Sequence, residues 1–236
     1  FGFPLDLTQD ALREKGLKVD VDAFDLAMKS QKEKARASWS GSGETTDSSI
    51  WFNISQEFGS TEFLGYETEK SEAKVLAIVC EGKEVSNAIA GASVQIVFNQ
   101  TPFYAESGGQ TGDSGQVELD GSVTHIEDVR LIAGIFVHFV DSLKFNLSVG
   151  DETKLNVNFE KRRAIKSNHS ATHLLNESLR KNLGNTVSQR GSLNSDDRLR
   201  FDFNYSKALS SEQINKIEKE VNTYIRQNSL VETRIM

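Results

Sequence analysis

The sequence of 236 residues has a single cysteine, no long apolar run and an excess of negative charge. Because Cys80 has no second cysteine to pair with, an internal disulfide is excluded, which fits a reducing cytosol and predicts a cytoplasmic protein. Its apolar, strand-like surroundings favour a small buried hydrophobic residue over a nucleophile. No apolar run approaches the roughly 20 residues that span a bilayer, and the N-terminus lacks the basic and apolar regions of a secretory signal. We therefore expect no membrane partner.

The net charge of −7 argues against general nucleic-acid binding, and we expect no DNA partner. The charge is nevertheless uneven along the chain. Residues 160–200 hold nine Lys or Arg and four Asp or Glu, a balance of +5, so the rest of the chain carries −12. A basic patch of this kind binds a phosphate backbone, and a solvated helix face explains the same charges equally well.

Several motifs of common enzymes are missing as well. No Walker loop, no Gly-x-Gly-x-x-Gly that opens a helix and no locally spaced Ser-His-Asp arrangement occurs. His169 and His173 are four residues apart in a helix-like stretch, so both imidazoles lie on one helical face and could reach one metal ion. Zinc proteases need a glutamate where this chain has Ser170, which excludes that class.

A hydrolytic zinc usually has three protein ligands, and only two are evident in this pair. The remaining histidines, His125 and His138, lie on strand-like segments that no spacing argument joins to the pair. The pair is therefore either structural or one part of a site whose other ligands lie outside the sequence.

A glycine-rich segment over residues 101–113 is the second candidate for chemistry. Gly108 and Gly109 permit close backbone approach to a ligand, and the Gln110 amide can both donate and accept hydrogen bonds. Composition alone favours a glycine-rich β-turn.

The pattern of elements predicts an α+β protein in three parts. Residues 1–40 are expected to be helical, with 41–49 as a linker, and 50–159 to form an antiparallel β-barrel or sandwich. Residues 160–236 are expected to form a distinct α+β unit. The predicted strands of the middle part are Phe63–Thr68, Lys74–Cys80, Ser93–Phe98, Gly115–Leu119, Val123–Leu131, Ile135–Asp141 and Thr153–Phe159.

The last part should begin with a helix that runs from Glu160 to Leu183, where Gly184 ends it. A hairpin then pairs residues 186–193 with 198–203, and Ser210 with Gln213 forms a capping box for a second amphipathic helix. Residues 231–236 are predicted to be a further strand. Because the chain starts at Phe1 and stops directly after this strand, we expect it to be a fragment of a longer protein.

Four stretches resemble the alanyl-tRNA synthetase family, in the family's order: residues 1–8, 101–113, 167–175, and 188–193 with 199–203. The segments Thr-Pro-Phe-Tyr-Ala-Glu-Ser-Gly-Gly-Gln and Asn-His-Ser-Ala-Thr-His-Leu-Leu are too long for a chance match. The resemblance implies the last helices of a tRNA-recognition domain followed by most of an editing domain. Such a domain hydrolyses tRNA(Ala) that carries serine or glycine, in an enzyme that attaches alanine to tRNA(Ala) with ATP and Mg²⁺ in a separate domain.

The resemblance also implies roles for individual residues. Gln110 belongs to the editing pocket, where it counts as a catalytic residue, and His169 and His173 are zinc ligands. The family adds a later Cys-x-x-x-His pair, which has no counterpart in this sequence. With tRNA(Ala) as the partner, the basic segment suggests phosphate contacts, for which the candidates are Lys161, Arg162, Arg163 and Arg190.

Two other interpretations stay open. A free-standing editing deacylase would share these motifs, although the helical residues 1–38 resemble the synthetase's preceding domain. The threonyl-tRNA synthetase editing domain shares a histidine pair, but the loop over 103–113 points away from it. An RNA-binding or structural module without activity is the alternative outside the enzymes.

Overall fold

The computed structural model describes residues 21, 23 and 47–230. The chain divides into two compact units, Phe1–Thr46 and Asp47–Met236, and every element from α3 to α5 belongs to the second. The predicted helices over 1–40 and the predicted strand over 231–236 lie outside the described residues. The proposed division of residues 50–236 into two domains stays a prediction.

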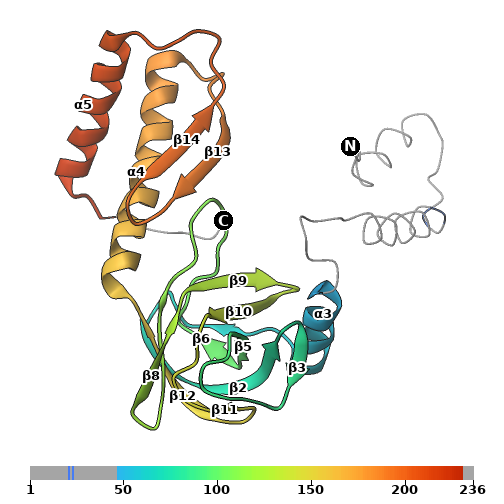
Figure 1. Ribbon diagram of the computed structural model, residues 1–236. Helices are drawn as coiled ribbons and strands as arrows, with labels where there is room; N and C mark the ends of the chain where they lie inside the picture. Colours follow the sequence, from blue (N-terminus) through green and yellow to red (C-terminus); the bar gives the residue numbers. More distant parts are fainter. Residues whose placement is uncertain (1–20, 22, 24–46, 231–236) are drawn as a thin grey trace. The chain divides into compact units, whose positions relative to one another are not determined.

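Eight antiparallel strands form one sheet that curls into a nearly closed barrel (Figure 1). The strand order is β8-β7-β12-β2-β5-β10-β9, with β3 paired to β2. Two short pairs complete this part, β1 with β6 in parallel and β4 with β11 antiparallel. The strands are β1 (Glu62–Phe63), β2 (Lys70–Cys80), β3 (Lys83–Val85), β4 (Asn87–Ala88), β5 (Val94–Phe98), β6 (Gln100–Thr101), β7 (Gly115–Leu119), β8 (Ser122–Ile126), β9 (Asp128–Ile132), β10 (Ile135–Val140), β11 (Leu147–Ser148) and β12 (Glu152–Val157).

Alternation of buried and exposed residues explains why these segments form strands. Along β12 every second side chain is buried, including that of Leu155, while its neighbours face outward. The inward side chains of the sheet make a core around Phe98, Phe103 and Ile126, all fully buried. The predicted α+β class with an antiparallel barrel-like part is confirmed.

Three local predictions in this part were wrong. The predicted strand Val123–Leu131 is two strands, because the chain changes partner at Glu127: β8 pairs with β7, whereas β9 pairs with β10. Only the first residue of the predicted strand Phe63–Thr68 is in a strand; the rest is a turn in which the Glu67 and Thr68 amides both donate to the Leu64 carbonyl.

A helix, α3 (Asp47–Phe58), occupies residues assigned from sequence to a linker and the start of the β region. Trp51 and Ile54, three residues apart, are buried on its inner face. They pack with Ala77, Val79 and Val137 on the outside of the sheet. The packing surface that stabilises this helix therefore comes from strands far along the chain.

The rest of the described chain is α4 (Phe159–Leu183), β13 (Gln189–Asn194), β14 (Leu199–Phe203) and α5 (Ser211–Gln227). Asn158 caps α4 by accepting from the Lys161 amide, and Gly184 ends the helix as predicted, at φ 108°. β13 and β14 form the predicted hairpin, and the Ser210–Gln213 capping box is confirmed. Leu179 of α4 and Ile217 of α5 meet in a small apolar core.

Candidate functional site

The glycine-rich segment forms a tight loop between β6 and β7, closed on itself by two backbone hydrogen bonds. The Gln110 amide donates to the Ser107 carbonyl at 2.9 Å, and the Ser107 amide donates to Gln110 at 3.2 Å. The turn needs positive φ angles of 59° at Gly108 and 83° at Gly109, which favour glycine. The backbone therefore presents Gln110 in a fixed position, with its side chain 7% exposed.

The loop rests directly on β13. The Asn194 amide donates to the Gly109 carbonyl at 2.7 Å, and the Thr111 amide donates to Asn194 at 3.0 Å. A Cβ at Gly109 would come within 2.6 Å of the Ser192 carbonyl oxygen. The close backbone approach that the sequence assigned to a ligand is thus made, at Gly109, by a strand of the same chain.

Gln110 meets the first histidine of α4. The distance from His169 Nδ1 to Gln110 Oε1 is 2.7 Å, across 59 residues of sequence. Because an amide oxygen only accepts, Nδ1 carries the proton and Nε2 keeps its lone pair. The predicted proximity of Gln110 and the histidine pair is confirmed.

The two imidazoles stack, with ring centroids 5.0 Å apart and planes at 18°. His169 is partly buried and His173 is exposed. Desolvation, followed by the neighbouring His173, lowers the pKa of His169 below its usual 6.5. The imidazole of His169 is therefore neutral at physiological pH, as a metal ligand must be.

Three polar residues that the sequence did not single out join the loop, α4 and β13. Asn194 is 1% exposed, and its Oδ1 accepts from the Thr172 hydroxyl at 2.6 Å. Asn168 Nδ2 donates to the Ser195 carbonyl at 2.7 Å. Asn168 and Thr172 flank His169 within the histidine motif, and this was the only signal for them. Nothing local marked Asn194.

Arg162 was wrongly predicted to contact phosphate. Its side chain is 7% exposed and forms an ion pair with Asp113, whose side chain is 1% exposed. The guanidinium also donates to the Pro102 carbonyl at 2.5 Å. All of these partners are protein groups, so Arg162 is an internal contact between α4 and the loop and does not belong to the basic surface.

The other three basic candidates are more accessible. Arg163 and Arg190 are exposed, and Lys161 is partly exposed near the start of α4. They lie on different elements, with Arg190 on β13. Their role in tRNA binding stays a prediction.

The remaining histidines lie on the barrel, apart from the pair. His125 is exposed on β8, and His138 on β10 is fully buried. His138 Nε2 is 2.8 Å from the Thr101 hydroxyl, and Nδ1 is 3.2 Å from the Ile96 carbonyl oxygen. These contacts satisfy both ring nitrogens internally, so His138 is a structural residue of the core.

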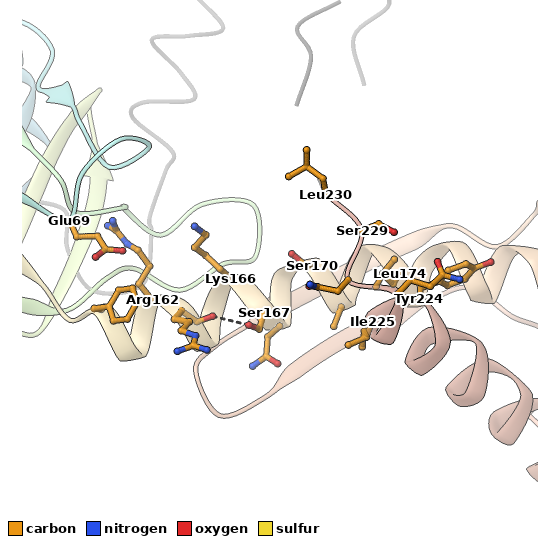
Figure 2. A pocket seen from close by; sticks show the side chains of 16 residues that line it. Glu69, Arg162, Lys166, Ser167, Ser170, Leu174, Tyr224, Ile225, Ser229 and Leu230 are labelled. Atoms are coloured by element: carbon orange, nitrogen blue, oxygen red, sulfur yellow. Dashed lines mark hydrogen bonds between the residues drawn. The ribbon is translucent and has the colours of Figure 1, made fainter. Parts of the chain in front are cut away.

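A groove of about 760 Å³ lies along a different face of α4 (Figure 2). Lys166, Ser167 and Ser170 line it from α4, and Tyr224 and Ile225 line it from α5. The Ser167 hydroxyl donates to the Arg163 carbonyl at 3.0 Å. Neither histidine of the pair lines this groove.

The part of the chain that the structure describes offers two ligands for a metal, and no more. Among residues 21, 23 and 47–230 no group of three or more His, Cys, Asp or Glu side chains gathers where a metal could bind. Cys80 is half-buried beside the barrel core. None of the helices within these residues is both long and apolar enough to cross a membrane.

Comparison with known proteins places these observations in a family. The model of the family described as tRNA synthetases class II (A) matches residues 1–161. The alanine–tRNA ligase of a Cereibacter sphaeroides strain is 58% identical over 236 residues, which are 100% of this chain and 27% of that protein. Those of Paracoccus denitrificans and a Ruegeria species are 55% and 54% identical with the same coverage. The chain thus spans about a quarter of the length of these relatives.

Proposed function

Since the chain belongs to the class II alanyl-tRNA synthetase family, we propose that it is part of a cytoplasmic enzyme that joins alanine to tRNA(Ala) with ATP. Within that enzyme, the described residues form the editing site, which hydrolyses the ester bond of Ser-tRNA(Ala) and Gly-tRNA(Ala). ATP and Mg²⁺ serve the aminoacylation step, in a part of the enzyme that the four matched stretches do not include.

The hydrogen bond between Gln110 and His169 carries this proposal. Two segments, each of which resembles a piece of one family pocket, meet at 2.7 Å although 59 residues separate them. Asn194 holds the loop to β13 and accepts a hydrogen bond from α4 through Thr172. A geometry held from three elements is what a site for precise hydrolysis requires.

The histidine pair fits one half of a zinc site. A ligating histidine usually donates its second ring nitrogen to an oxygen acceptor, and His169 Nδ1 donates in this way to Gln110 Oε1. Nε2 of His169 and the exposed ring of His173 are then free to bind the metal. A bound zinc would polarise the ester carbonyl or activate water. The described residues supply two ligands, so further ligands must come from elsewhere.

The residues of the chain would position and shield the ester. Gln110 orients His169 and leaves its own amide protons for the aminoacyl group or the attacking water. Arg163, Arg190 and Lys161 would contact tRNA phosphates. The chemical need for such a site is clear, because a pocket for alanine cannot strongly reject glycine, which is smaller, or serine, which adds one hydroxyl.

The synthetase is favoured over a free-standing deacylase by two findings. The family model begins at residue 1, which includes the segment before the β-barrel. The relatives that match the whole chain carry the name alanine–tRNA ligase.

A hybrid enzyme tests the proposal. This chain replaces the matching segment of the Cereibacter sphaeroides alanine–tRNA ligase, and hydrolysis of Ser-tRNA(Ala) and charging of tRNA(Ala) with alanine are both measured. We expect the hybrid to perform both reactions. His169→Ala should slow hydrolysis at least about tenfold, since a metal ligand and its orienting contact are lost, and should leave alanine charging unchanged. A hybrid that charges alanine normally, but hydrolyses Ser-tRNA(Ala) no faster than its His169→Ala variant, would contradict the editing role.

A further inference from the structure

A buried ion pair lies beside the proposed editing site without belonging to its reacting groups. Arg162 is on the first turns of α4, and Asp113 is at the end of the glycine-rich loop. Arg162 Nε donates to Asp113 Oδ2 at 3.1 Å, and Nη2 donates to the same oxygen. Burial of 93% and 99% for the two side chains excludes them from solvent and from a bulky substrate.

The pair ties α4 to several backbone segments at once. Arg162 Nη2 donates to the Pro102 carbonyl at 2.5 Å, and Asp113 Oδ2 accepts from the Tyr104 amide at 2.6 Å. Residues 102, 104 and 113 are the two ends of the loop that carries Gln110. The guanidinium therefore fixes the base of this loop against one point on the helix.

The spacing along both segments connects this point to the site. Arg162 and His169 are seven residues apart on α4, which places them on nearly the same face, roughly 10 Å apart along the axis. Asp113 and Gln110 are three residues apart in the loop. The loop thus contacts α4 at two places, Asp113 with Arg162 and Gln110 with His169. A rotation or shift of the helix at the first contact would displace the imidazole at the second.

We propose that Arg162 and Asp113 are positioning residues of the editing site: their buried ion pair sets the rotation and height of α4 so that His169 Nδ1 meets Gln110 Oε1. The inference rests on the proposed function for its effect on hydrolysis, but not for its effect on the hydrogen bond. The planar fork of Arg162 matters as much as its charge, because lysine cannot reach a carboxylate and a carbonyl in one plane.

The kinetic experiment uses the hybrid enzyme with Arg162→Lys, Asp113→Asn and the double variant. The control is Leu147→Ala, which creates a cavity in the barrel core, where the side chain is 0% exposed. We expect each single variant to lower kcat for Ser-tRNA(Ala) hydrolysis at least about tenfold, since a displacement of about 1 Å can cost 100-fold. KM should change less than about twofold, and the double variant should lose no more than the worse single variant. Leu147→Ala should keep kcat at temperatures below its melting transition.

A spectroscopic experiment on the 236-residue chain is independent of hydrolysis. With ¹⁵N-labelled histidine, the proton on His169 Nδ1 should give a protected resonance that is lost in His169→Ala and in Arg162→Lys and kept in Leu147→Ala. Retention of this resonance and of kcat in both ion-pair variants would overturn the inference. So would a rise in KM as large as the fall in kcat, or an equal loss in Leu147→Ala. An inactive wild-type hybrid would refute the editing function instead, and the resonance alone would then decide the role of the pair.

Discussion

The buried histidine of the barrel should make the protein sensitive to mild acid. Burial of His138 lowers its pKa from 6.5 to about 4, against the opposing effect of its backbone hydrogen bonds. Its ring nitrogens contact Thr101 and Ile96, and its ring lies edge-on to Phe98 and Phe103 at 4.9 and 5.5 Å. Protonation puts a charge into an apolar core and removes the acceptor at Nε2.

The sign and size follow from proton linkage. Between pH 6.5 and about 4 the unfolded chain binds a proton at His138 and the folded chain does not. The stabilisation from the neutral ring is therefore fully present above pH 6.5 and is lost as the pH falls towards 4. At about 1.4 kcal/mol per pH unit, the free energy of unfolding should decrease by about 3 kcal/mol over this range.

Denaturant unfolding of the 236-residue chain between pH 7.5 and 4.5 measures this contribution. The His138→Gln variant, which cannot titrate, should show a smaller decrease by about 3 kcal/mol, although it is less stable at neutral pH. His125→Gln removes an exposed imidazole from β8 and is the matched control, which should follow the wild type. If His138→Gln and the wild type lose stability in parallel as the pH falls, the argument from burial is wrong.

Three further outcomes are expected. Gly109→Ala should destabilise the chain by about 2–4 kcal/mol, because the new Cβ adds a steric clash with β13 to the strain of a positive φ; Gly108→Ala, where φ is 59° and the space is open, should cost only about 1–2 kcal/mol by thermal denaturation. The 236-residue chain should bind zinc weakly, since the described part supplies two ligands, and stoichiometric zinc by elemental analysis would contradict this. Charge reversal at Arg163 or Arg190 in the hybrid should weaken tRNA binding and reduce the dependence of its logarithm on log salt by about 1 per contact; an unchanged affinity and slope would indicate a solvated face instead.

Some features of this protein were determined by short stretches of sequence. The helix that became α4 was predicted almost to its ends, because its apolar spacing and Gly184 act within a few residues. The capping box at Ser210 and the β13–β14 hairpin were predicted for the same reason. Alternation with a period of two gave the antiparallel barrel-like sheet, although not its strand order.

The candidate site was only partly predictable. The pairing of Gln110 with the histidines came from resemblance to a family, since no spacing rule joins residues 59 apart. Asn194 was missed because a lone asparagine at the end of a strand has no pattern; its role appears only when three elements meet around it.

Tertiary structure decided the features in which distant residues compete with local preference. Residues 47–58 became the helix α3 because strands of the sheet bury Trp51 and Ile54. Arg162 follows Lys161 and precedes Arg163, and in sequence it is indistinguishable from them. Only the fold brings the carboxylate of Asp113 and the carbonyl of Pro102 to it, so that one basic residue of three is buried and the others stay at the surface. Sequence determines which charges and apolar groups are present, but burial depends on which partners the folded backbone brings within hydrogen-bonding distance.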